Sequence, residues 1–287
     1  MILIFIAGVL WGTIGIFVNE LNALGAGSSL TCFLRMFFAF VIMFSLAIVK
    51  RGKKFFIADR KTIFLCAMLG LVCHGIFNIC YTASIKLNGM GVACVLMYSA
   101  PVFTAAASRI IFRERLSSLK IFALALNILG CVMTVTGGDI FNNSDISLIG
   151  ILAGLGSGFC YGMAAIFGKA LGEKTDSLTM SAYSYFFAVL FFAVFTRLEI
   201  NLALENLKIP VVGFLYGLIP TSLAYLVYYN GLRRVANASS VPVIASIEPV
   251  AAVIIGMVIY NEHVGAGNFV GIAIVLSSIA IMMKKNK

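Results

Sequence analysis

The chain has 287 residues, of which 61% are hydrophobic and only 11% are charged, and its formal net charge is +10. Soluble domains are about 45–50% apolar and about 25% charged, so this composition excludes a soluble fold and requires lipid as the solvent. The cations lie in short segments between apolar runs, which argues against the basic folded face of a nucleic-acid-binding protein.

Ten apolar runs are long enough to cross a bilayer as helices, which takes about 20 residues each. In chain order they are 2–19, 29–49, 62–85, 91–112, 117–137, 146–169, 177–197, 209–231, 238–260 and 265–283. They lack the alternating pattern of about ten residues that is typical of an outer-membrane barrel. The sequence therefore predicts an all-α integral membrane protein with ten transmembrane helices.

The Lys and Arg residues are unevenly divided between the predicted loops. With the N-terminus in the cytoplasm, 17 of the 21 fall on the cytoplasmic side, three fall outside and one, Arg35, lies within a span. Loops rich in Lys and Arg stay on the cytoplasmic side of the membrane. We therefore expect a multi-pass protein of the bacterial inner membrane with both termini in the cytoplasm.

The two halves of the chain carry related residues at a nearly constant spacing of 147 to 150 positions. The matched pairs are Trp11 and Tyr161, Tyr81 and Tyr228, Pro101 and Pro249, and Glu114 and Glu262. Each half holds five predicted helices, an odd number, so the second copy must face the opposite way. The predicted domains, 1–137 and 146–284, therefore form one membrane unit of two inverted five-helix repeats, an architecture of secondary transporters.

Several motifs in both halves point to the same architecture. They are Leu10-Trp11-Gly12, Phe33-Leu34-Arg35, Ala83-Ser84-Ile85-Lys86 through Pro101 to Phe112-Arg113-Glu114-Arg115-Leu116, and Asn230-Gly231-Leu232-Arg233-Arg234 through Glu248-Pro249 to Asn261-Glu262-His263-Val264. Together they resemble the EamA family of the drug/metabolite transporter superfamily over essentially the whole chain. The resemblance implies a ten-helix carrier that exports amino acids or other small metabolites.

Two ionisable side chains stand out within the predicted spans, where a central charge costs about 2.5–3.5 kcal/mol. Glu248 precedes Pro249, which removes a backbone N–H and leaves the carbonyl of Ala245 without its helical partner. A carboxylate beside such a break suits a proton or cation site, although a neighbouring helix could satisfy it as a structural group. Arg35 is a candidate charge partner that could bind a substrate carboxylate or pair structurally. Pro101 and Pro249 are candidate hinges, or else static kinks.

Polar residues form related stripes in the two halves, because the spacing i, i+4, i+7 keeps them on one helix face. The stripes are His74, Asn78 and Tyr81 in the first half and Thr221, Tyr225 and Tyr228 in the second. In inverted copies they would face each other across a cavity, where His74 could carry a proton; hydrogen bonds between packed helices are the alternative. Trp11, Tyr98 and Tyr161 could add aromatic walls for an amphipathic or cationic substrate, or belong to interfacial belts.

The sequence shows no motif for a catalytic, metal or cofactor site. The seven cysteines all lie in apolar runs without a C-x-x-C pair, and no nucleotide-binding loop or H-E-x-x-H occurs. We therefore predict a secondary active transporter, not an enzyme, that binds a small-molecule substrate within the lipid bilayer and exports it by alternating access. Protons are the candidate coupling ion. The alternatives are a lipid-modifying membrane enzyme, which would need catalytic groups in larger loops, and a channel.

Overall fold

The computed structural model describes residues 1–52, 55, 58–138, 147–172, 175–196 and 200–284. Within these residues the chain is helical and contains no strand, so the predicted all-helical fold is confirmed. The helical elements of the first half are α1 (Ile2–Gly12), α2 (Ile14–Ala23), α3 (Ser28–Arg51), α4 (Arg60–Met68), the π-helical segment η2 (Leu69–Ile76), α5 (Phe77–Met97), α6 (Ala100–Ile111) and α7 (Ser118–Thr136).

The second half is also helical and contains more short elements. They are α8 (Leu148–Gly172), α9 (Ser177–Thr196), α10 (Ile200–Glu205), α11 (Lys208–Gly217), the π-helical segment η3 (Leu218–Leu223), α12 (Ala224–Leu232), the 3₁₀ turn η4 (Ala238–Ser240), α13 (Val241–Ala245), α14 (Ile247–Ile259) and α15 (Ala266–Lys284). The predicted span limits at 146 and 197 lie outside the described residues.

Nine helical segments of the described chain are long and apolar enough to cross a membrane, and Ala100–Ile111 is a shorter apolar helix. This composition and length confirm an integral membrane protein. The longest segment, Arg60–Met97, is interrupted at Gly89, whose φ of 80° and ψ of 163° are not helical. The positive φ suits glycine, which has no Cβ to clash. The two predicted spans 62–85 and 91–112 lie on either side of this interruption.

The two halves share their departures from regular α-helix. Each contains one π-helical segment, η2 before α5 and η3 before α12. Tyr98 and Ser246, which are 148 positions apart, each separate two helices, α5 from α6 and α13 from α14. Arg113 and Asn261, also 148 apart, have φ values of 53° and 52°, which non-glycine residues rarely adopt. The same irregularities therefore occur at equivalent positions of the two halves.

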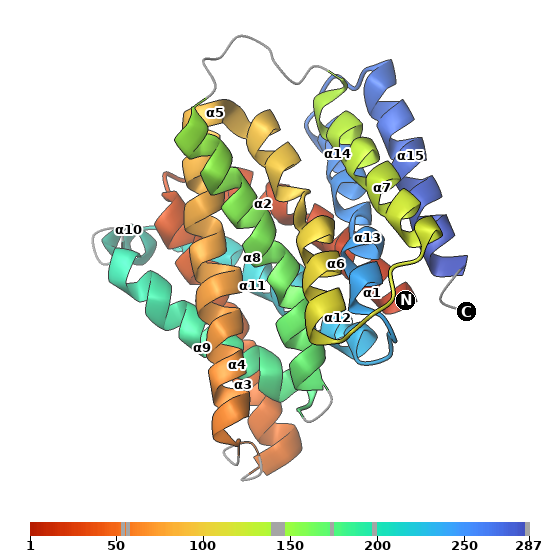
Figure 1. The fold of residues 1–287 in the computed structure, drawn as a ribbon. Coiled ribbons are helices and arrows are strands. Elements are labelled where there is room, and N and C mark those ends of the chain that lie inside the picture. Colours follow the sequence, from red (N-terminus) through yellow and green to blue (C-terminus); the bar gives the residue numbers. More distant parts are fainter. Residues whose placement is uncertain (53–54, 56–57, 139–146, 173–174, 197–199, 285–287) are drawn as a thin grey trace.

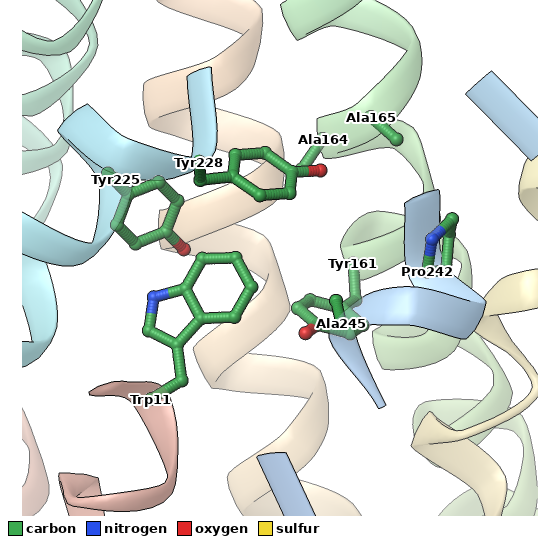
Figure 2. A pocket seen from close by; sticks show the side chains of 8 residues that line it. All are labelled: Trp11, Tyr161, Ala164, Ala165, Tyr225, Tyr228, Pro242 and Ala245. Atoms are coloured by element: carbon green, nitrogen blue, oxygen red, sulfur yellow. The ribbon is translucent and has the colours of Figure 1, made fainter. Parts of the chain in front are cut away.

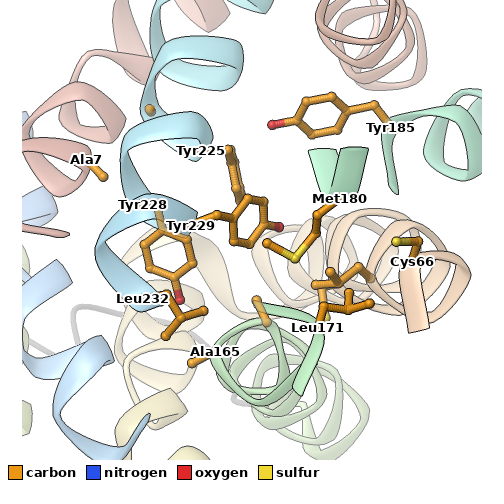
Figure 3. Packing of buried hydrophobic residues seen from close by; sticks show 14 of the residues in the cluster. Ala7, Cys66, Ala165, Leu171, Met180, Tyr185, Tyr225, Tyr228, Tyr229 and Leu232 are labelled. Atoms are coloured by element: carbon orange, nitrogen blue, oxygen red, sulfur yellow. The ribbon is translucent and has the colours of Figure 1, made fainter. Parts of the chain in front are cut away.

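Elements of the first half pack along elements of the second. In Figure 1, α5 lies along α8 and α7 along α15, and α3 packs on α9. The first helix, α1, packs against α12, α13 and α14. Figure 3 shows part of the largest buried cluster, which joins Cys66 from the first half to Tyr185, Tyr228 and Tyr229 from the second. The halves are therefore interleaved into one bundle.

A row of glycines on α8 lets that helix approach α5 and α6 closely. Gly154, Gly158 and Gly162 follow one another at i, i+4 spacing and face these neighbours. A Cβ on Gly158 would lie 2.8 Å from the carbonyl oxygen of Leu96. At the next turn, the Thr104 hydroxyl donates to the carbonyl of Gly162 at 2.9 Å. Close contact and a hydrogen bond between helices replace the hydrophobic driving force that lipid removes.

Gly158→Ala is expected to lower thermal stability, because the added Cβ meets a backbone carbonyl that cannot move away. Overpacking of this kind costs about 1–3 kcal/mol. Gly156 provides a matched control on the same helix, since a Cβ there would only touch Cys80 Sγ at 3.4 Å. The melting temperature in detergent should fall for Gly158→Ala and not for Gly156→Ala. Equal melting temperatures for the two variants would contradict the packing role of the row.

Candidate functional site

Four aromatic side chains meet between the two halves of the bundle. Trp11 from α1 lies 5.0 Å from Tyr225 and 5.1 Å from Tyr228 of α12, measured between ring centroids. Tyr161 from α8 lies 6.4 Å from Trp11. Figure 2 shows these rings pointing toward one another across a shared space. Trp11, Tyr225 and Tyr228 are buried.

The rings surround a small cavity, whose remaining walls are small or rigid side chains (Figure 2): Ala164, Ala165, Pro242 and Ala245. Its volume is about 10 Å³, roughly the room that one water molecule needs. A metabolite is many times larger. Binding a substrate here therefore requires the helices around the rings to move apart.

Glu248 lies beside the aromatic cluster in the first turn of α14. The Tyr161 hydroxyl donates to its Oε2 at 2.9 Å. The break at Ser246 starts a new helix just before this residue, and the positive end of a helix favours a nearby carboxylate. On its other side, Gly12 lets α1 approach closely, since a Cβ there would lie 3.0 Å from the carbonyl oxygen of Glu248. The broken helix thus places an acid within the bundle.

Arg35 on α3 is another charged group inside the bundle, with only 8% of its surface exposed. Its Nε donates to Thr221 Oγ1 at 3.0 Å and one terminal nitrogen donates to the Tyr216 hydroxyl at 3.4 Å. The guanidinium also lies 5.2 Å from the centre of the Tyr216 ring. Within the described residues, no carboxylate forms an ion pair with Arg35. The partners that the described residues offer this buried cation are neutral, a costly arrangement that an anionic ligand would relieve.

His74 connects the surroundings of Arg35 to the aromatic cluster. It lies in η2, buried between Tyr185 at 5.6 Å and Tyr225 at 5.1 Å. Its Nε2 and the Nε1 of Trp11 are buried and have no hydrogen-bond partner in the described structure. Unpartnered buried polar atoms are costly, so both are available to a polar ligand. No group of three or more His, Cys, Asp or Glu that could hold a metal occurs among the described residues.

The structure brings together seven of the residues that the sequence singled out for substrate binding. Four of them line the cavity: Trp11, Tyr161, Tyr225 and Tyr228. Glu248 is hydrogen-bonded to Tyr161, and the His74 ring contacts the Tyr225 ring. Thr221 accepts a hydrogen bond from Arg35.

The other three predicted binding residues do not line the cavity. Asn78 donates to the carbonyl of His74 at 2.7 Å. The Tyr81 hydroxyl lies 2.8 Å from Cys94 Sγ. Tyr98 is buried in a separate cluster with Cys94 and Cys131.

The two prolines differ from the expected kinks within continuous helices. Pro101 and Pro249 lie in the first turn of α6 and α14, after the breaks at Tyr98 and Ser246. A proline is tolerated there because the first N–H groups of a helix have no partner within it. The breaks themselves, rather than the prolines, separate the helices.

Sequence reasoning missed three tyrosines near this site. Tyr185 and Tyr229 belong to the same ring cluster, and Tyr216 contacts Arg35. The run Tyr225, Tyr228, Tyr229 was a signal that the second half concentrates tyrosines on one turn. Tyr185, which lies two positions after Tyr183, and Tyr216, which stands alone in an apolar run, have no tyrosine counterpart that the spacing between the halves would single out.

The sequence model of the EamA-like transporter family matches this chain twice, over residues 1–136 and 148–284. The chain belongs to the EamA-like transporter family. Residues of both matched regions contribute to the candidate site of this EamA-like protein. Trp11 and Arg35 belong to the first region, and their partners Tyr225 and Thr221 belong to the second.

Relatives of this EamA-like protein are named as transporters. An uncharacterized transporter of Archaeoglobus fulgidus is 24% identical over 98% of this chain and 95% of its own length. The uncharacterized transporter YetK of Bacillus subtilis is 23% identical over 86% of this chain and 75% of its own length. A protein of known crystal structure superimposes with a TM-score of 0.81 over 98% of this chain and 97% of its own length, at 15% identity. That likeness concerns the fold alone.

Proposed function

We propose that this EamA-like protein is a secondary active transporter that exports a small zwitterionic metabolite, such as an amino acid. The observation that carries the proposal is a pair of opposite charges, Glu248 and Arg35, that are held by residues of the aromatic cluster or next to it. Glu248 accepts a hydrogen bond from Tyr161 of the ring cluster. Arg35 donates to Thr221, which lies one helical turn before Tyr225 of the same cluster. Among the described residues no ion pair joins Arg35 to Glu248, so neither charge neutralises the other directly. A zwitterion offers each group its counterion.

The aromatic rings between the two charges suit the remainder of such a substrate. Ring faces attract an ammonium group by cation–π interaction and pack against an apolar side chain. The buried Nε1 of Trp11 can donate only, so it would favour a carboxylate oxygen or another acceptor. Recognition of both a charge pair and an apolar body is the chemistry of a small amphipathic metabolite.

Alternating access is the mechanism that this proposal requires. Ten crossings in two inverted five-helix repeats would supply two related gates around the site. The irregularities shared at a spacing of 148 positions support such a duplication. The small cavity is consistent with a state in which the site is closed around its rings. We place the protein in the bacterial inner membrane with both termini in the cytoplasm, on the distribution of Lys and Arg.

Glu248 would couple export to protons. A carboxylate in this environment is stabilised by either a proton or a substrate ammonium, and one site cannot hold both. Substrate would therefore leave as a proton enters. The same competition gives an exchange of substrate for protons without any nucleotide or cofactor.

The decisive experiment is uptake into proteoliposomes that contain the purified protein. A thermal-shift screen of amino acids and other small metabolites would first identify a binder, because a ligand of the folded state raises the melting temperature. Saturable transport of that binder, accelerated by a pH gradient, is the expected result. Folded protein without saturable uptake would overturn the proposal, conductance without saturation would favour a channel, and modification of lipid would favour an enzyme.

A further inference from the structure

Glu114 closes one end of the bundle from the turn between α6 and α7. Its Oε1 accepts hydrogen bonds from the backbone N–H of Ala238 at 2.6 Å and from Lys169 Nζ at 2.9 Å. Its Oε2 accepts from the N–H of Ser239 at 3.3 Å and from the Ser239 hydroxyl at 2.8 Å. Only 8% of the Glu114 surface is exposed. A carboxylate of the first half is thus bound to the start of a helix in the second half.

This carboxylate is well suited to hold that helix start. Burial by itself would raise the pKa of Glu114, but hydrogen bonds from Lys169, Ala238 and Ser239 outweigh burial, so the pKa lies below its usual value. The group is therefore ionised near neutral pH, and hydrogen bonds to an ionised acceptor are the stronger kind. Lys169 also donates to the carbonyl of Ala236 at 2.5 Å, which ties α8 into the same contact.

The second half contains the same turn with a different contact. Glu262 lies 148 positions after Glu114 and follows Asn261, whose positive φ of 52° matches the φ of 53° at Arg113. The backbone N–H of Glu114 donates to the carbonyl of Ser108 at 3.3 Å, and that of Glu262 donates to the equivalent carbonyl of Gly256 at 3.1 Å. The turns are alike in backbone, so their side chains could make the same contact.

In the described residues, however, Glu262 makes no such contact. It is exposed, and its carboxylate folds back over Gly256 near the end of the preceding helix, α14. The positions that correspond to Ala238 and Ser239, 148 residues earlier, are Met90 and Gly91. Met90 is 66% exposed and directly follows the interruption at Gly89. One end of the bundle is latched, and the equivalent latch at the other end is open.

We propose that Glu262 is the second latch, and that it binds the backbone N–H groups of Met90 and Gly91 in an alternate state in which Glu114 releases Ala238 and Ser239. The inference rests on the proposed alternating access, because two inverted copies change state by exchanging the contacts that each makes. The described structure is then the state latched by Glu114. Both acids are gating residues, since neither lies at the aromatic cluster.

Hydrogen–deuterium exchange of the full-length protein in nanodiscs tests this latch directly. Glu114→Ala should raise the exchange rate at Ala238 and Ser239 by about tenfold, the effect of losing a strong helix cap. The same variant should slow exchange at Met90 and Gly91, because the population shifts to the state latched by Glu262. Adding Glu262→Ala should abolish that slowing. Unchanged exchange at Met90 and Gly91 in both variants would overturn the proposal.

A single variant provides a second reading that leaves the Glu114 contacts intact. Glu262→Ala should slow exchange at Ala238 and Ser239, because it removes the competing state, whereas the exposed Glu205→Ala on α10 should change neither end. No slowing with Glu262→Ala would also count against the latch. Flux assays on the same samples distinguish the proposed transport from the proposed latch. If hydrogen–deuterium exchange at the two ends changes as expected but no flux occurs, transport is refuted and the latch is retained.

Discussion

Glu248→Gln is expected to reduce transport about 100-fold while leaving the protein folded, because a hydrogen bond to a charged group contributes about 1.5–3 kcal/mol. Glutamine keeps the size of the side chain, and its carbonyl can still accept the hydrogen bond that Tyr161 donates at 2.9 Å. It cannot take up a proton or pair with an ammonium group. Initial rates in proteoliposomes, measured with and without a pH gradient, give both the loss of rate and the loss of pH dependence.

Two controls separate the charge of Glu248 from its hydrogen bond and from a general effect of removing an acid. Tyr161→Phe removes the hydroxyl but leaves the carboxylate, so we expect a loss of about tenfold with the pH dependence retained. Glu205→Gln removes an exposed acid on α10 and should have no effect. A folded Glu248→Gln protein that transports at the normal rate, with normal pH dependence, would rule out this role.

Most spans could be predicted from the sequence to within a few residues, whereas the predicted span 91–112 is divided between the end of α5 and the short helix α6. The expected span 209–231 is observed as Lys208–Leu232, and 117–137 as Ser118–Thr136. Length and hydropathy suffice because a bilayer fixes how long an apolar helix must be. The interruptions within spans were less accessible. Proline marked two of them approximately, whereas the π-helical segments η2 and η3 follow from packing that no local pattern encodes.

At the candidate site, too, residues marked by local sequence features could be predicted, whereas contacts between residues far apart in the chain could not. Trp11 and Tyr161 were found because both halves carry an aromatic residue at that place, and Glu248 was found because an acid within a span is rare. The partners of Arg35 were not foreseen as such, since Tyr216 lies 181 positions away in the chain. A membrane helix without a distinct polar face does not indicate which of its sides faces the site, so the position of Tyr185 in the ring cluster could be assigned only from the structure.

Arg35→Gln is the second substitution with a large expected effect, an increase in KM of about 100-fold with a smaller change in kcat. The Nε of the guanidinium donates to Thr221 and one terminal nitrogen donates to Tyr216, so its remaining N–H donors can bind the substrate. A hydrogen bond to a charged group contributes about 1.5–3 kcal/mol, and the neutral glutamine loses that contribution in the bound state. Concentration-dependent uptake of the binder found by thermal shift measures KM and kcat separately.

The role of Arg35 is resolved by changing the substrate as well as the protein. If the guanidinium binds the substrate carboxylate, an analogue with a carboxamide in that place should bind weakly to the unmodified protein and lose nothing further with Arg35→Gln. Tyr216→Phe keeps the charge and removes only the hydroxyl at 3.4 Å, so its effect on KM should be small. Should Arg35→Gln weaken the acid and its amide equally, the arginine would instead support the fold around Thr221, and the charge pair proposed for substrate recognition would reduce to Glu248 alone.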